Sequence, residues 1–362
     1  MAYSVNSLKV QSTRFTSNDE FSRAAINNKQ LAPTINAQPQ VLPVTNAQPT
    51  PVILENVRNM YYLAPVTIGG QSYKVVVDTG SSNMWIRGLV INENTHVTKK
   101  VKHLSFNAGN ATSVISHADV MLGDIEISDF YFLYAQQQVF FKAKAQYPYD
   151  FDIGDGIIGL CAGNQSVDAL PYPSFLDSAN IQKFNLYLTN GRVPSEFSVG
   201  EPDINKFTGE MGFENVVDDR NFWEIQMTGV GTSSKRLILT VKETIIDSGT
   251  PFIMLSLTAC HQINTMIGAT INRQINAYVI NCASALSAPP LEFTMASGSV
   301  YSIPASIYII THGEMCISAI SWYSEQSATG KRNILGATFL RAMFSHFDRS
   351  GKRIGFASAK YL

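Results

Sequence analysis

Two segments of the sequence each place an aspartate directly after a run of apolar residues. Residues 75–82 read VVVDTGSS and residues 244–251 read TIIDSGTP, which puts Asp78 and Asp247 in matching positions. In both segments the aspartate is followed by a hydroxyl residue, a glycine and a second hydroxyl residue. A run of β-branched residues is typical of a buried strand, and a carboxylate at the end of such a strand is costly unless it accepts hydrogen bonds. Each aspartate therefore needs donors close by.

The following residues can supply those donors. A glycine permits a tight turn, after which backbone N–H groups and the hydroxyls of Ser81 and Thr250 can reach the carboxylates. If the two loops face each other, the carboxyl groups become neighbours that cannot both ionise, so the pair shares one proton. One carboxyl then acts as general base on a water molecule and the other as general acid on a carbonyl oxygen. This chemistry hydrolyses an amide without a covalent intermediate.

The elements that must position these loops are predicted to be strands. From Met60 onward, short β-branched and aromatic runs are separated by Gly, Asn and Asp, which is typical of an all-β architecture. Helix signals are few, and residues 256–268 are predicted to form one surface helix. A second repeated motif, two apolar residues followed by a glycine and one more residue, occurs downstream of each aspartate. It reads DGIIGL at 155–160 and RNILGA at 332–337. The repeated aspartate motif and the repeated glycine motif occur in the same order and at similar spacing, which predicts a duplicated unit of roughly 150 residues.

Composition excludes several classes of protein. The 362 residues carry 27 Lys plus Arg against 28 Asp plus Glu, so net charge gives no case for nucleic-acid binding. Hydrophobic residues make up 45%, yet no run approaches the length of a membrane span. None of the four cysteines lies in a C-x-x-C pair and the six histidines are scattered, which argues against a zinc site. We therefore expect no metal, no cofactor, no nucleic acid and no membrane partner.

The first 50 residues differ from the rest of the chain. Residues 31–50 contain no charged residue and four prolines, and nearly repeat themselves as NAQPQ and NAQPT, which predicts an extended linker. Residues 1–30 carry four cations against two anions. The N-terminus shows no apolar core of a signal peptide.

The sequence resembles the pepsin-like aspartic proteases (peptidase family A1), and is similar to their shorter fungal members. The resemblance covers residues 54–362 and rests on both Asp-Ser/Thr-Gly loops, both downstream glycine motifs, NFWEIQM at 221–227 and FDRSGKRIGFA at 347–357. It implies a mainly β, bilobal fold of two pseudo-two-fold-related lobes with a few short helices. The implied activity is that of an aspartic endopeptidase that cleaves proteins, with large hydrophobic residues preferred around the scissile bond.

The resemblance also implies roles for particular residues and segments. Asp78 and Asp247 are the implied catalytic pair, supported by the following loop residues: Thr79, Gly80, Ser81, Ser248, Gly249 and Thr250. Thr79 and Ser248 would tie the loops together, and Ser81 and Thr250 would bond the outer carboxylate oxygens. The implied substrate-binding side chains are Trp85, Phe106, Phe222 and Ile334, and the implied disulfide joins Cys282 to Cys316.

The implied domain organisation is a propeptide with a Pro-rich linker at 1–50, an N-terminal catalytic lobe at 51–216 and a C-terminal catalytic lobe at 217–362. A basic propeptide residue, Arg23 or Lys29, would lie against the carboxylate pair near neutral pH and be released on acidification. The implied partners are polypeptide substrates and pepstatin-like inhibitors, with the enzyme a monomer. Family members of this kind are secreted or vacuolar/lysosomal.

One departure from the family pattern concerns the hairpin flap that closes over the substrate. HLSFNAGNATS is the best match to the flap, and it places Phe106 where a tyrosine is usual. The hydroxyl that normally bonds to the side chain at Trp85 is therefore missing. This departure keeps open an alternative, a catalytically silent or weak binding protein on the same fold.

Other motifs have weaker support. GDGIIG at 154–159 matches a dinucleotide fingerprint, but its flanks give neither a clear preceding strand nor a following helix. The acidic residues at 150–155 lack the glutamate that a calcium-binding EF-hand needs at its twelfth position. Cys161 and Cys260 lie in apolar contexts and are predicted to be buried, inert thiols. No serine-hydrolase elbow and no H-E-x-x-H motif occurs.

Overall fold

The computed structural model describes residues 49–106, 109–139, 154–163, 170–217, 222–285, 287–323 and 331–361. All of them belong to one compact unit, Pro39–Leu362. The predicted propeptide and almost all of its linker lie outside the described residues. Strands predominate in the described part of the chain, which confirms the predicted all-β class.

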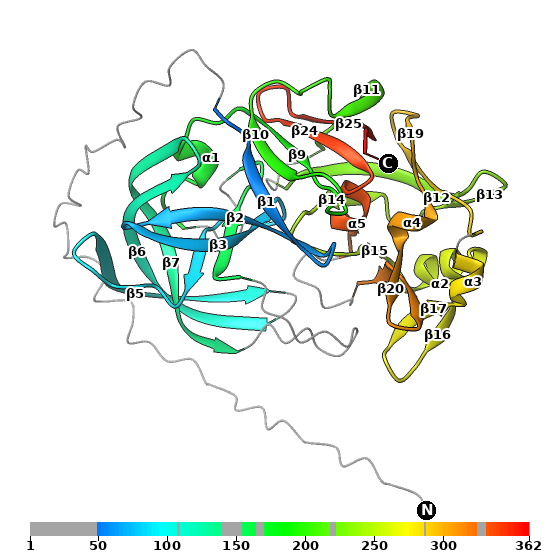
Figure 1. The fold of residues 1–362 in the computed structure, drawn as a ribbon, viewed down its shortest axis with the longest axis horizontal. Coiled ribbons are helices and arrows are strands. Elements are labelled where there is room, and N and C mark those ends of the chain that lie inside the picture. Colours follow the sequence, from blue (N-terminus) through cyan, green and yellow to red (C-terminus); the bar gives the residue numbers. More distant parts are fainter. Residues whose placement is uncertain are drawn as a thin grey trace, which may run out of the picture. The chain divides into compact units, whose positions relative to one another are not determined.

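The largest sheet contains strands from both ends of the described chain (Figure 1). Its 13 described strands follow the order β11-β25-β24-β9-β10-β1-β2-β3-β8-β4-β7-β6-β5. Their bounds are β1 (Val52–Val57), β2 (Tyr61–Ile68), β3 (Gln71–Asp78), β4 (Trp85–Arg87), β5 (Thr95–Phe106), β6 (Gly109–Leu122), β7 (Ile125–Val139), β8 (Gly156–Gly159), β9 (Lys183–Tyr187), β10 (Ser195–Val199), β11 (Phe207–Asn215), β24 (Met343–Asp348) and β25 (Arg353–Ala359).

Two smaller sheets and five short helices complete the described elements. The eight-stranded sheet comprises β12 (Glu224–Thr232), β13 (Lys235–Ile238), β14 (Glu243–Ile246), β15 (Ile253–Leu255), β18 (Leu291–Met295), β19 (Val300–Ile303), β22 (Ile320–Trp322) and β23 (Asn333–Leu335). The four-stranded sheet comprises β16 (Thr270–Asn272), β17 (Ala277–Ile280), β20 (Ile309–His312) and β21 (Met315–Ser318). The helices are α1 (Phe175–Ser178), α2 (Leu257–Met266), α3 (Cys282–Ala285), α4 (Ala305–Tyr308) and α5 (Ala337–Leu340).

The strand pairing repeats itself around the two aspartates. β3, which ends at Asp78, pairs in parallel with β8, and β14, which ends just before Asp247, pairs in parallel with β23. β4 is antiparallel to β8 and parallel to β7, just as β15 is antiparallel to β23 and parallel to β22. The strands before the aspartates are buried on both faces, which explains their continuous apolar runs. The duplication predicted from the sequence is therefore visible in the pairing.

The C-terminal strands hold the two halves of the described chain together. β24 and β25 leave the second half and pair with β9 and β11 of the first sheet, as the red and green strands of Figure 1 show. The Phe347 ring on β24 stacks on the Phe184 ring of β9, with 4.6 Å between centroids. The indole N–H of Trp223 donates to the carbonyl of Leu160 at 2.8 Å. Large buried rings thus anchor each half to the other.

The predicted helix at 256–268 is present as α2, and the hydroxyl of Ser256 caps it by accepting from the backbone N–H of Ala259 at 3.3 Å. None of the helices in the described residues is long and apolar enough to cross a membrane.

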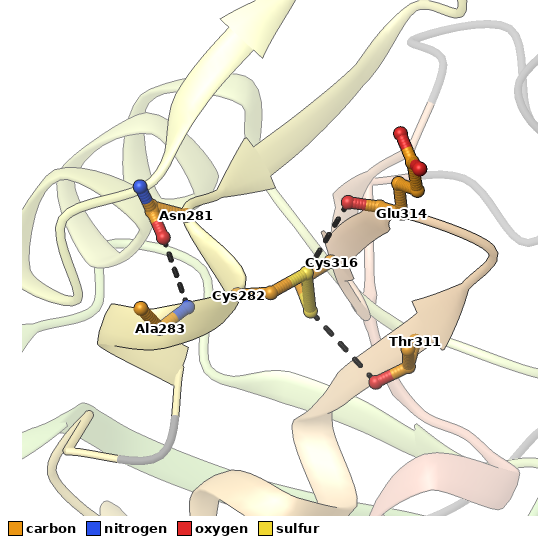
Figure 2. Close-up of a disulfide and its surroundings, with 6 residues drawn as sticks. All are labelled: Asn281, Cys282, Ala283, Thr311, Glu314 and Cys316. Atoms are coloured by element: carbon orange, nitrogen blue, oxygen red, sulfur yellow. Dashed lines mark hydrogen bonds between the residues drawn. A yellow bond between two sulfur atoms is a disulfide. The ribbon is translucent and has the colours of Figure 1, made fainter.

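A disulfide joins Cys282 at the start of α3 to Cys316 on β21 (Figure 2). Both cysteines line an open pocket of about 580 Å³, and Glu314 lines the same pocket.

Candidate active site

Asp78 and Asp247 each sit in a loop that satisfies the carboxylate in the same way. The Oδ1 atom of Asp78 accepts from the N–H of Gly80 at 2.9 Å, and its Oδ2 atom accepts from the hydroxyl of Ser81 at 2.6 Å. Asp247 accepts from the N–H of Gly249 at 2.9 Å and from the hydroxyl of Thr250 at 2.6 Å. The two carboxyl-bearing residues are only 7% and 8% exposed. Local donors therefore offset the cost of burying both groups.

The two loops are bonded to each other through Thr79 and Ser248. The backbone N–H of Thr79 donates to the hydroxyl of Ser248 at 3.0 Å, and the N–H of Ser248 donates to the hydroxyl of Thr79 at 3.0 Å. Each hydroxyl then donates across to the other half, to the carbonyls of Ile246 at 2.8 Å and Val77 at 2.7 Å. Four buried hydrogen bonds thus fix the aspartates relative to one another.

The loop glycines serve a purpose that the sequence did not indicate. Both glycines lie in turns, but neither has a positive φ, so a left-handed backbone is not the reason for glycine at these positions. A Cβ on Gly80 would lie 2.5 Å from Cγ of Asp247, and a Cβ on Gly249 would lie 2.5 Å from Cγ of Asp78. Each glycine is needed because the opposite carboxyl group packs directly against it. The expected turns are present at both glycines, and the group that would hinder a Cβ in each turn is the carboxyl group of the opposite loop.

The environment favours one proton on the pair of carboxyl groups. Burial raises the pKa of Asp78 well above the ordinary carboxyl range, and the charge of Asp247 raises it further. A hydrogen bond between the two carboxyl groups acts in the same direction, while the donors Ser81 and Gly80 oppose it. Because the two carboxyl groups are hydrogen-bonded to each other, the extra proton is shared between them rather than held by one residue.

This shared proton predicts a pH dependence of stability. The folded state holds it more tightly than the unfolded chain, so the stabilisation is complete below the unfolded pKa of about 4 and is lost as pH rises through the raised folded pKa. Asp78→Asn cannot titrate at this position. The wild-type free energy of unfolding minus that of Asp78→Asn should therefore fall from pH 4 to pH 7, by at most about 1.4 kcal/mol per pH unit.

Urea unfolding of both proteins at several pH values measures this difference. The comparison cancels the contribution of His346, whose pKa burial lowers and whose effect on stability has the opposite sign. A difference that stays constant between pH 4 and pH 7 would show that the pair holds no extra proton.

The predicted substrate-binding residues occupy different environments. Trp85 is 3% exposed and packs in a cluster on one face of the first sheet, the Trp85 cluster, made up of Leu63, Val76, Trp85, Ile115, Leu133, Ala135, Ile157 and Leu170. Ile334 on β23 is 2% exposed, which leaves little of its surface for a substrate. Phe222 is partly exposed and lies under the guanidinium of Arg332, 5.7 Å from its ring centroid. Their contact with a substrate stays a prediction.

The predicted flap residue is only partly described. Phe106 is the last residue of β5 and its backbone pairs with that of Gly109 on β6, so it lies at the end of a hairpin. Its side chain lies outside the described part of the structure. The prediction that Phe106 covers the scissile bond therefore stays a prediction.

One side chain near the carboxyl pair was not predicted from the sequence. Tyr61 begins β2, and burial, followed by the charges of Asp247 and Asp78, raises its pKa to about 12. Its ring packs against the Trp85 cluster and against the Ile317 cluster, which comprises Met60, Ala277 and Ile317. The sequence does contain a signal for Tyr61. The two-residue Gly69-Gly70 turn fixes the register of the hairpin, and counting back from the turn leads to Tyr61 on one strand and Asp78 on the other.

The competing motifs gain no support from the structure. The glycines of GDGIIG lie in or next to strand β8, not in a strand-to-helix turn. Burial raises the pKa of the Cys161 and Cys260 thiols to about 12, as expected for inert buried cysteines. The described residues contain no group of three or more His, Cys, Asp or Glu side chains placed to hold a metal ion.

Comparison with known proteins finds relatives of this chain among the aspartic proteases. A family model described as eukaryotic aspartyl protease matches residues 61–359. The chain is 29% identical over 335 residues to a probable vacuolar protease A of Arthroderma benhamiae, covering 85% of this chain and 81% of that protein. It is 26% identical over 331 residues to pepsin II-1 of Oryctolagus cuniculus, covering 84% and 83%. The aspartic proteinase from Irpex lacteus has the same fold, with a TM-score of 0.73 at 20% identity over 86% of this chain and 98% of that chain.

Proposed function

The chain belongs to the eukaryotic aspartyl protease family, and we propose that it hydrolyses peptide bonds in proteins with a water molecule activated between Asp78 and Asp247. The observation that carries this proposal is the pair of matching loops, tied together by Thr79 and Ser248. Both loops are intact, which favours an enzyme over a non-catalytic binding protein on the same fold.

The proposed reaction uses the shared proton at each step. The ionised carboxyl removes a proton from water as the water oxygen bonds to the peptide carbonyl carbon, and the protonated carboxyl gives its proton to the carbonyl oxygen. In the second step the carbon–nitrogen bond of the intermediate breaks. The carboxyl group that took a proton from water gives it to the amine nitrogen, and the other carboxyl group takes a proton from a hydroxyl of the intermediate. The hydroxyls of Ser81 and Thr250 keep the carboxyl groups oriented throughout. No cofactor is required by this sequence of steps.

The proposed substrates are extended polypeptides with large apolar side chains beside the scissile bond. Apolar sites with few polar groups suit such side chains, and Trp85, Phe106, Phe222 and Ile334 are the proposed contacts. Pepstatin-like peptides are the proposed inhibitors, and the enzyme is proposed to act as a monomer. Its relatives include proteins named vacuolar protease A, and a vacuolar/lysosomal or secreted location is proposed here.

The proposed domain organisation is a propeptide with linker at 1–50 and catalytic lobes at 51–216 and 217–362. The contacts of Thr50 and β1 support the first boundary. The N–H of Thr50 donates to the Asp124 carboxylate at 3.0 Å, and β1 then pairs with both β10 and β2. Cleavage near residue 50 would therefore leave β1 in place within the first sheet.

Incubation of the full chain at pH 4 tests the function and the propeptide together. We expect acid to neutralise the carboxylates that hold Arg23 or Lys29, so that about 50 residues are lost while cleavage of an apolar peptide rises. Mass spectrometry and the peptide assay follow the two changes in one sample. The Asp247→Asn chain is the matched control and should keep both its mass and its inactivity.

The possible outcomes separate the two proposals. Full activity in the uncleaved wild-type chain at the first time point would show that residues 1–50 are only a tail. No cleavage of any peptide after the segment has been lost would contradict the proposed enzyme function.

A further inference from the structure

Tyr61 lies close enough to the carboxyl pair for the charges of Asp247 and Asp78 to act on it, and the register of the first hairpin leads to the same place. β2 and β3 are antiparallel, with Leu63 opposite Val76. Both strands continue two residues past that pair, to Tyr61 on β2 and Asp78 on β3. The paired residues end at Leu63 and Val76, and the same register extended by two residues along each strand leads to Tyr61 and Asp78.

The two residues also share a face of the sheet. Side chains along a strand alternate between faces, and Tyr62 and Ala64 lie in the main core on one face of β2. Leu63 lies in the Trp85 cluster on the other face, and Val76 of β3 lies in the same cluster. Tyr61 and Asp78 are each two positions from a member of that cluster, so both belong to its face.

The Tyr61 ring forms an apolar wall at this position. It packs against the Trp85 cluster of the first sheet and against the Ile317 cluster, which β17 and β21 of the four-stranded sheet contribute with Met60. Apolar groups from both halves of the chain thus meet at the ring. The raised pKa of Tyr61 keeps its phenol neutral at acid and neutral pH, so it does not compete for the shared proton.

We propose that Tyr61 is a positioning residue of the carboxyl pair, whose ring keeps water away from Asp78 so that the pair retains its shared proton to a higher pH. This inference rests on the proposed function and adds a determinant of the pH range in which the enzyme works. A small polar side chain in place of the ring would admit water to Asp78, and hydration favours the ionised form of a carboxyl group. The pair would then lose its proton at a lower pH.

The other titratable groups around Asp78 do not by themselves account for the pH at which the pair loses its proton. Among the described residues, Asp247 lies on the opposite loop, and the Cys161 thiol lies beyond β8 with its pKa raised by burial. Tyr131 and Tyr172 also pack against the Trp85 cluster, and burial raises the pKa of Tyr131. The side chains of the Ile317 cluster do not titrate.

The test is the pH profile of kcat/KM for three variants on one apolar peptide. Tyr61→Ser should move the alkaline limb of the profile to lower pH by about 0.5 to 1 unit. Tyr61→Phe keeps the ring and should leave the limb where the wild type has it. Leu63→Ala is the matched control, since it removes apolar volume from the same cluster but lies opposite Val76. It should lower thermal stability without moving the limb.

Each outcome decides the matter. A shift in Tyr61→Ser alone supports the proposal, and an unshifted limb in an active, folded Tyr61→Ser enzyme overturns it. An equal shift in Leu63→Ala also overturns it, because general loosening would then explain the effect. If Tyr61→Ser does not fold, Tyr61→Asn retains more volume while admitting water, and the same shift is expected. A wild-type chain that cleaves no peptide contradicts the proposed function instead.

Discussion

Gly249→Ala should lower kcat by about 100-fold or more while the chain stays folded. The added Cβ would lie 2.5 Å from Cγ of Asp78, which is too close for two non-bonded carbon atoms unless something moves. Asp78 must then shift, or the loop around Asp247 must open, and either change separates the two carboxyl groups that we propose to act together. Misplacement of a reacting group by about 1 Å costs on the order of 100-fold in rate. Steady-state kinetics on an apolar peptide, with circular dichroism as the check on folding, measure the effect.

Gly212→Ala is the matched control for this substitution. A Cβ on Gly212 would lie 2.5 Å from the hydroxyl of Tyr301, so the crowding is similar but does not involve Asp78 or Asp247. It should lower the melting temperature and leave kcat within a few-fold of the wild type. Comparable kcat values for the two glycine variants would show that Gly249 does not serve the pair.

The sequence predicted those features that depend on local patterns and their repetition. The apolar runs before Asp78 and Asp247 became β3 and β14, and the glycine motifs became β8 and β23, each paired in parallel with its partner. Resemblance to the family pointed to the disulfide between Cys282 and Cys316, which the structure contains. The helix at 256–268 followed from its cap and its terminal glycine.

Features that depend on approach between distant segments could not be predicted. The reason for Gly80 and Gly249 is contact with the opposite carboxyl group, and nothing local in either loop shows that distance. The buried ion pair between Arg332 and Glu224, 2.7 Å apart, joins residues far apart in the chain and carries no sequence motif.

Tyr61 is an intermediate case between local and distant features. The Gly69-Gly70 turn, with both φ angles positive, sets Ile68 opposite Gln71 and thereby the register of the whole hairpin. A register counted back from that turn would have placed Tyr61 opposite Asp78. Its packing against the Ile317 cluster, however, depends on the return of β17 and β21, which the sequence does not reveal.

The central claim is that Asp78 and Asp247 act as one acid–base pair, and kcat of the two asparagine variants tests it most directly. Asparagine preserves the size of each side chain but can neither accept a proton from water nor share one, so Asp78→Asn and Asp247→Asn should each lower kcat by several orders of magnitude. Asp348→Asn is the matched control, because Asp348 is 1% exposed and bonded to Arg353 but belongs to β24. It should reduce stability and leave kcat within a few-fold. An Asp247→Asn enzyme that keeps most of the wild-type kcat on an apolar peptide at acid pH would contradict the proposed mechanism.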